Sequence, residues 1–304
     1  MDCLLSVAHT RVMPDDAEAE VIALIAGAAD EDPYSKWDGT HWRLVELADL
    51  AAMGTAVSMS EVRSMVDAEF RWLLGDGHVG GIRTIAGLTR AHASQEGNAI
   101  YALSILGWAD DQRTKALAER LMSWQWPDGG WNCDRGPGVV RSSFHESVTP
   151  ALGLAVFGKA TRTARAVEAA HRTSELILES GVVFSRTRPH TVVHPSWTIL
   201  HYPPYWHYDV LQGLRLLAEL DLLADPRAAE AVEIVKRSRS LEGFRGRSWA
   251  SGRQPPAIIR GRSPSNRMLN ELALRVVLTA TGAGTGARAT PSRPTPPFDA
   301  ISAQ

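Results

Sequence analysis

The segment WQWPDGGWNCD, residues 124 to 134, combines three tryptophans, a Pro-Asp-Gly-Gly run and one of the two cysteines of the chain. Pro, Asp and Gly favour tight turns, and tryptophans provide large apolar surfaces for packing. The part that ends at Trp131 therefore predicts a turn that clamps neighbouring helices together. Cys133 and Asp134 follow the turn, and their side chains are of the types that bind metals.

Glycines that end helical patterns recur on both sides of this segment. They are Gly77, Gly129, Gly181 and Gly243, at intervals of 52, 52 and 62 residues. A helical repeat of this length is typical of open solenoids and of closed rings of helix pairs.

Helical patterns that are almost wholly apolar alternate with amphipathic ones along the chain. The apolar segments are 40–54, 98–107, 150–158, 209–220 and 269–282. In the amphipathic segment 112–124, Leu117, Leu121 and Trp124 fall at helical spacing, with charged residues on the other faces. Helices that are apolar on all sides are buried, and amphipathic helices lie outside them. We therefore expect an all-α fold, an α/α toroid of about five inner–outer helix pairs, or six with the N-terminal region.

The composition of the chain indicates its domain boundaries and the class of protein to which it belongs. Residues 1–280 are expected to form one toroid domain, and residues 281–304, which are rich in Gly, Pro, Ser and Thr, a disordered tail. A net charge of −2 argues against nucleic-acid binding. Two cysteines cannot form a disulfide framework, and no apolar run is long enough to cross a membrane. These features predict a cytoplasmic protein, and they leave peripheral membrane contact and the oligomeric state open.

Polar residues precede each of the apolar segments. In a closed ring the starts of the inner helices lie at the same end, so these residues would converge on one mouth. The ionisable ones are His41, Glu96, His145, Glu146, His207 and Asp209. Several ionisable groups in one cavity are typical of active sites. We expect Glu146 with His145, and Asp209 with His207, to act as acid–base pairs, and Glu96 to be a further catalytic residue.

Aromatic residues gather in the same segments and would line the centre of the ring. The candidate substrate-binding residues are His41, Trp42, Tyr101, Phe144, Tyr202, Tyr205, Trp206 and Tyr208. Such a lining suits a small apolar, polyene-like substrate, because aromatic faces stabilise carbocations. The alternative for these rings is ordinary core packing.

The segment QWPDGGW, residues 125–131, resembles the QW motif of squalene–hopene cyclases, which share an α/α toroid with the β-subunits of protein prenyltransferases. In that family the Gln and Trp tie the start of one helix to the loop after another, parts that fall here to Gln125 and Trp131. The resemblance implies a single-barrel, terpene-cyclase-like enzyme that cyclises or isomerises an apolar isoprenoid after protonation. The family's DxDD motif is absent, since WADD at 108–111 lacks the first Asp, and no DDxxD motif is present.

Zinc chemistry is the second hypothesis. The prenyltransferase β-subunits bind zinc through Asp, Cys and His, and the matching types here are Cys133, Asp134, His145 and His207, without the family's D-x-C spacing. This set would support zinc-dependent prenyl transfer or lyase chemistry at Cys133 and His145. Two readings remain open: a non-catalytic toroid scaffold that binds a lipid or a partner protein, and carbohydrate hydrolysis by paired carboxylates such as Glu96 and Glu146.

Overall fold

The protein is mostly helical, as predicted. The structure is a computed structural model that describes residues 14–26, 32–35, 38–247, 249 and 266–282. The α-helices of this described part are α1 (Pro14–Ile25), α2 (Thr40–Ala52), α3 (Arg63–Leu73), α4 (Asp76–Val79), α5 (Ala93–Ile105), α6 (Gln112–Ser123), α7 (Val148–Thr161), α8 (Ala164–Leu178), α9 (Val210–Glu219), α10 (Ala229–Arg237) and α11 (Arg267–Ala280). The predicted tail 281–304 lies outside the described residues from residue 283 onward.

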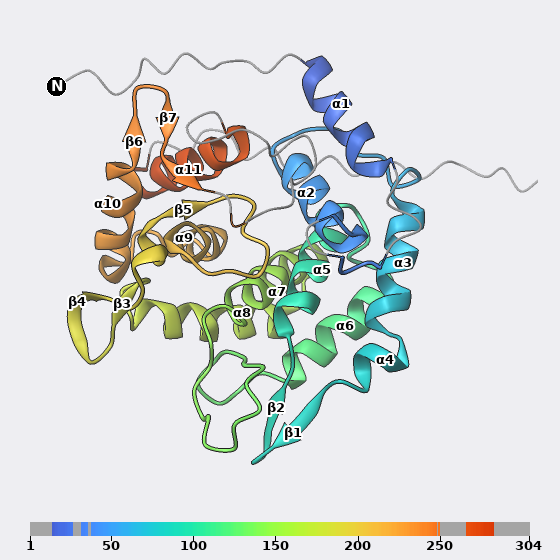
Figure 1. Cartoon of the computed structure of the whole chain (residues 1–304), viewed down its shortest axis with the longest axis horizontal. Helices are drawn as coiled ribbons and strands as arrows, with labels where there is room; N and C mark the ends of the chain where they lie inside the picture. Colours follow the sequence, from blue (N-terminus) through green and yellow to red (C-terminus); the bar gives the residue numbers. More distant parts are fainter. Residues whose placement is uncertain (1–13, 27–31, 36–37, 248, 250–265, 283–304) are drawn as a thin grey trace, which may run out of the picture.

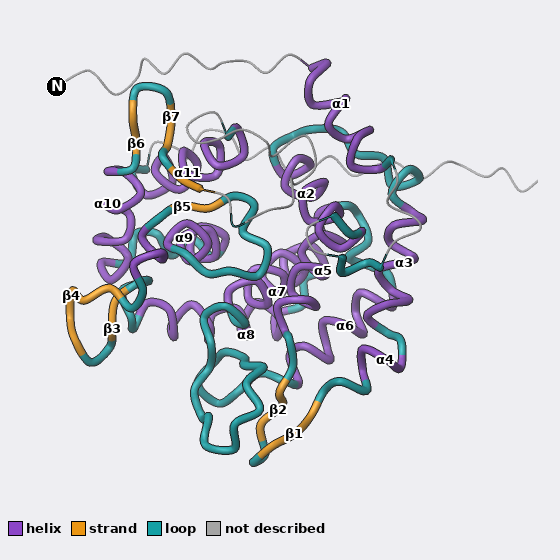
Figure 2. The backbone as a smooth tube through the Cα atoms, in the orientation of Figure 1, coloured by secondary structure: helices purple, strands orange, loops and turns teal. Residues whose placement is uncertain are grey.

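Short strands and two 3-10 turns complete the described part. The antiparallel hairpins are β1 (Arg83–Ile85) with β2 (Leu88–Arg90), β3 (Phe184–Ser185) with β4 (Arg188–Val192), and β6 (Arg239–Ser240) with β7 (Gly243–Phe244). These hairpins project from the helical body (Figure 2). β5 (Leu200–His201) pairs in parallel with β8 (Gly246–Arg247), and the 3-10 turns are η1 (Pro195–Thr198) and η2 (Pro226–Ala228).

The helices differ in burial in the way that their sequence patterns indicate. In α5, eleven of the thirteen residues are buried, whereas α6 buries one face through Thr114, Leu117, Ala118, Leu121 and Met122. Successive apolar helices pack side by side, α2 against α5, α5 against α7, α7 against α9 and α9 against α11. The amphipathic helices α3, α6, α8 and α10 lie around them (Figure 1). At the end of this series, Arg275 of α11 donates a hydrogen bond of 3.1 Å to the carbonyl of Ala52 in α2.

Small residues allow the closest of these helix contacts. A Cβ atom on Gly97 of α5 would overlap the backbone at Pro150 of α7, and one on Gly153 of α7 would overlap the carbonyl of Gly97. The two apolar helices therefore approach backbone to backbone, and this contact fixes where the start of α5 lies relative to the start of α7.

The turn in 124–134 forms a clamp between α6 and α8. The Gln125 side chain donates hydrogen bonds of 2.9 Å to the carbonyls of Gly129 and Ala169, and the Trp131 indole donates one of 3.0 Å to the carbonyl of Leu121. Gly129 has a φ of +94°, which an L residue rarely adopts. Gln125 and Trp131 thus hold the turn as the motif predicts, with one difference: Gln125 contacts the middle of α8 and not its start.

A buried polar cluster joins the interior faces of three helices. Asp49 of α2 accepts hydrogen bonds from the hydroxyls of Tyr101 (2.7 Å) and Tyr202 (2.9 Å), and Arg215 of α9 pairs with it at 2.7 Å. Asp49 and both tyrosines are buried.

Among the described helices none combines the length and the apolar character needed to cross a membrane.

Candidate functional site

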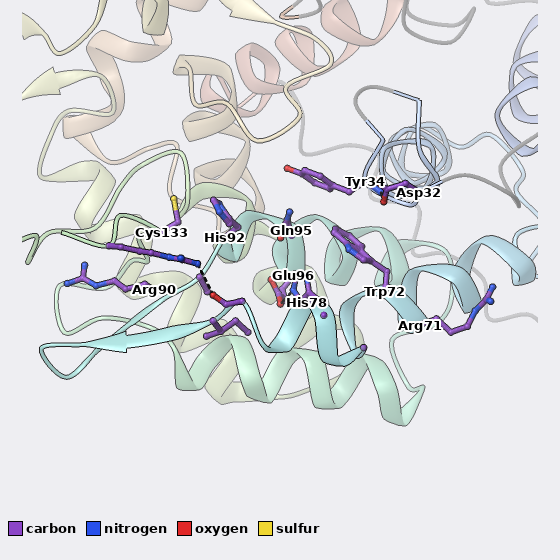
Figure 3. Close-up of a pocket in the computed structure, with 16 residues that line it drawn as sticks. Asp32, Tyr34, Arg71, Trp72, His78, Arg90, His92, Gln95, Glu96 and Cys133 are labelled. Atoms are coloured by element: carbon purple, nitrogen blue, oxygen red, sulfur yellow. Dashed lines mark hydrogen bonds and ion pairs between the residues drawn. The ribbon is translucent and has the colours of Figure 1, made fainter. Parts of the chain in front are cut away.

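A pocket of about 650 Å³ lies beside the first turn of α5. Its walls come from the segment before α2, from α3 and α4, from the end of β2 and from the loop after the clamp. The aromatic and ionisable residues that line it are Asp32, Tyr34, Arg71, Trp72, His78, Arg90, His92, Glu96, Cys133 and Arg135. Figure 3 shows His92 and Cys133 at one end of the pocket and Tyr34, Trp72 and Asp32 toward the other.

Three side chains with metal-binding atoms meet at the first of these ends. His92 is the N-cap residue of α5, Cys133 follows the clamp, and Glu146 lies two residues before α7. One ligand atom from each of the three lies within 4.8 Å of the others. We refer to His92, Cys133 and Glu146 as the trio.

Hydrogen bonds hold the trio in place. Glu146 accepts a hydrogen bond of 3.0 Å from the backbone N–H of Ser94 in the first turn of α5, and its other oxygen lies 3.3 Å from Nδ1 of His92. A carboxylate at this point is also favoured by the positive end of the helix dipole. Glu146 is buried, Cys133 is half-buried and His92 is exposed, and of the three only His92 and Cys133 line the pocket.

The electrostatics of the trio favour a cation. Hydrogen bonds from His92 to Cys133 and to Glu146 raise the pKa of His92 to about 10, against the opposing effect of burial. The imidazole of His92 is therefore protonated at neutral pH. Thiolate, imidazole and carboxylate are all zinc ligands, and three protein ligands with an open fourth position are the usual composition of a catalytic zinc site. The residues of the trio fit that metal.

Glu96, a carboxylate that lines the pocket, has two hydrogen-bond partners. Glu96 in the first turn of α5 accepts hydrogen bonds from Nε2 of His78 (2.8 Å) and from Arg120 (3.0 Å). Glu96, predicted as catalytic, thus lines the pocket and is held by two hydrogen-bond partners. Its contacts connect α4 and α6 to α5 and keep the pocket floor in place.

The other predicted catalytic residues do not form the predicted pairs. The buried Asp209 caps α9 and bonds to His201, with 3.0 Å between Oδ2 and Nδ1. His207 lies in a ring stack between Trp206 and Trp249. His145 accepts a hydrogen bond of 2.9 Å from the backbone N–H of Tyr208, and burial lowers its pKa. Glu146 belongs to the trio, where its side chain contacts His92 and not the predicted partner His145.

Most of the predicted substrate-binding residues pack in the core. Trp42, Tyr202, Tyr205 and Tyr208 are almost fully buried, and Tyr101 is 7% exposed. His41 is also buried and hydrogen-bonds Glu69 at 2.7 Å. Phe144 stacks on Trp197, and Trp206 stacks on His207. The pocket lining in the described part of the chain includes none of these eight residues.

The predicted metal ligands are brought together only in part. Cys133 belongs to the trio, whereas Asp134 is exposed and accepts a hydrogen bond of 2.8 Å from the backbone N–H of Gly136. His145 and His207 lie 6.2 Å apart between ring centroids, and neither is among the three residues that meet. His92 was not predicted from the sequence, although it begins the polar run HASQEGN that precedes an apolar helix. Tyr34 was not predicted either, because no motif marks it.

Comparison of the chain with protein-family models, with curated proteins and with solved structures finds no match.

Proposed function

We propose that this protein is a zinc-dependent enzyme in which His92, Cys133 and Glu146 hold the metal at the wall of the pocket. The observation that carries the proposal is the meeting of three different ligand types within 4.8 Å beside a pocket of about 650 Å³. That volume is in the range of pockets that enclose a small organic substrate. The proposed reaction is group transfer or lyase chemistry on such a substrate.

The proposed architecture is an α/α toroid, with α2, α5, α7, α9 and α11 as the inner helices. The alternation of buried and amphipathic helices supports it, as does the bond from Arg275 to Ala52 between the last and the first inner helix. The clamp at Gln125 and Trp131 supports a relation to the squalene–hopene cyclase and protein prenyltransferase group. In this architecture the starts of α5 and α7 bring His92 and Glu146 to the same end.

The residues of the trio have separate parts in the proposed site. Cys133 and Glu146 supply the negative charge, and His92 supplies a neutral donor once its proton has left. The bond from Ser94 N–H orients the Glu146 carboxylate, as outer hydrogen bonds orient metal ligands in general. Bound zinc would supply a Lewis acid that polarises a substrate oxygen or acidifies a coordinated group.

Cobalt substitution tests the proposal, because a cobalt–thiolate bond gives a near-ultraviolet charge-transfer band. We expect the protein to bind one equivalent of Co²⁺ with this band, and Cys133→Ser to lose it. His92→Ala and Glu146→Gln each remove a direct ligand, so they should weaken Co²⁺ binding by at least the roughly 10- to 100-fold that loss of an outer hydrogen-bond partner costs. Cys3→Ser, which removes the other thiol, is the matched control. A band that survives in Cys133→Ser would overturn the proposal.

A second proposal, acid-initiated cyclisation or isomerisation of an apolar isoprenoid, is favoured by Glu46. This buried carboxyl in α2 has a raised pKa, chiefly because of burial, and is therefore a candidate proton donor. The acid route needs no metal. Conversion of a linear polyprene by chelator-treated protein would favour this route over the zinc route, and a complete loss of product would count against it.

A further inference from the structure

Tyr34 lies in the pocket opposite the trio. Its phenol oxygen points toward the end of the pocket that holds His92 and Cys133, and the amide of Gln95 lies beside it (Figure 3). Burial raises the pKa of Tyr34, and electrostatic interactions with Glu146 and Cys133 raise it further. The hydroxyl thus faces the same space as the three candidate metal ligands.

The Tyr34 ring is held by aromatic packing. It stacks on Trp72 of α3 at 5.2 Å between ring centroids, and it contacts Trp42 of α2 at 5.0 Å. Both partners come from helices, so the phenol has a fixed direction. Trp72 also lines the pocket, which places a flat apolar surface beside the hydroxyl.

The Tyr34 hydroxyl carries its proton at neutral pH. A side-chain hydrogen bond with Gln95 lowers the pKa of Tyr34, and burial, which has the larger effect, raises it. The net effect of all causes raises the pKa of Tyr34 to about 12, so that the phenol keeps its proton at neutral pH.

We propose that Tyr34 binds and polarises an oxygen atom of the substrate, so that the substrate is a small carbonyl-type compound with a flat apolar part against Trp72. This inference rests on the proposed zinc site, because the same oxygen would lie between the trio and the hydroxyl. A neutral donor on one side and a cation on the other both favour negative charge on that oxygen. Tyr34 is then a substrate-binding residue that selects for an oxygen acceptor.

Two probes of the cobalt-loaded protein test this inference. Acetohydroxamate binds a metal through oxygens that can accept a hydrogen bond, whereas imidazole binds through nitrogen and offers Tyr34 no oxygen. We expect Tyr34→Phe to weaken acetohydroxamate binding by about tenfold, the value of one hydrogen bond, and to leave imidazole binding unchanged. Binding is measured from the visible spectrum of Co²⁺. Arg71→Ala is the matched control, because Arg71 lines the same pocket and extends away from the trio (Figure 3).

The outcomes separate this inference from the proposed function. If Co²⁺ binds through Cys133 but Tyr34→Phe binds acetohydroxamate as tightly as the unchanged protein, the inference is overturned and the zinc site stands. An equal loss for both probes would assign Tyr34 a structural role and would also overturn the inference. If Co²⁺ does not bind through Cys133, the zinc site and the inference both fail.

Discussion

Glu46 is the residue whose chemistry is most unusual for its surroundings. It is 3% exposed, and neither of its carboxylate oxygens has a hydrogen-bond partner in the described part of the chain. Burial, followed by the charge of Asp49 one helical turn away, raises its pKa well above 4.5. In the folded protein the neutral form is therefore favoured over a wider pH range than in the unfolded chain.

This shift predicts a specific dependence of stability on pH. Because the folded protein holds the Glu46 proton more tightly, the stabilisation is complete below the unfolded pKa and is lost as pH rises through the folded pKa. Glu46→Gln cannot ionise, so it should lose less stability than the unchanged protein when pH is raised from about 5 to about 8. Urea denaturation at both pH values measures the difference. The exposed Glu61→Gln is the control, and equal losses in Glu46→Gln and the unchanged protein would contradict the assignment.

At the scale of a residue, the sequence did not predict that His92 lies beside Cys133. The residue types predicted Cys133 as a metal ligand and Glu146 as a catalytic residue, and the structure brings these two side chains together with His92. His92 was missed because its place depends on the path of the loop after the clamp. That loop runs beside β2, where Asn132 forms a parallel bridge with Arg90. This contact brings Cys133 to His92, and no sequence spacing encodes it.

At the scale of an element, the clamp could largely be predicted from the sequence. Pro, Asp and two glycines predicted its turn from the residue types, and the resemblance to the QW motif implied that Gln125 and Trp131 hold it. The helix that Gln125 reaches was less predictable. Its bonds to Gly129 and to Ala169 depend on where α8 crosses the turn, which is a result of packing.

Gly129 should be the residue of the clamp that tolerates substitution least. An added Cβ would lie 2.6 Å from the carbonyl oxygen of Arg172 in α8, and the φ of +94° would itself be strained. We expect Gly129→Ala to lower the free energy of unfolding by about 1–3 kcal/mol, the usual cost of such a backbone conformation. Thermal and urea unfolding measure the loss. Gly138→Ala, where nothing lies within 4 Å of the added Cβ, should have little effect; similar losses in both variants would contradict the role of the turn.

At the scale of the whole molecule, hydrophobic patterning was sufficient for the helical class and for the order of buried and amphipathic helices. It was not sufficient for the content of the interior. The tyrosines predicted to line an apolar cavity, Tyr101 and Tyr202, instead donate hydrogen bonds to Asp49. Asp49 and Arg215 are 166 positions apart, and two polar residues within apolar helices do not reveal in sequence that they are partners.

The Asp49–Arg215 pair should couple α2 and α9 in the stability of the whole molecule. Removing one member of a buried ion pair leaves an uncompensated charge, at a cost of about 3–5 kcal/mol. Arg215→Met should therefore lower the free energy of unfolding by that amount. In Asp49→Asn with Arg215→Met, the remaining charge is gone, so the loss should be smaller than the sum of the two single losses.

Urea denaturation of the two single variants and the double variant measures this coupling. The exposed pair of Arg165 and Glu119 is the control, because Arg165→Met should cost less than about 1 kcal/mol. Strictly additive losses for Asp49→Asn and Arg215→Met would show that the two helices are not coupled through this pair. A coupled result would mean that the interior of the helix assembly is held by charge and hydrogen bonds at its centre.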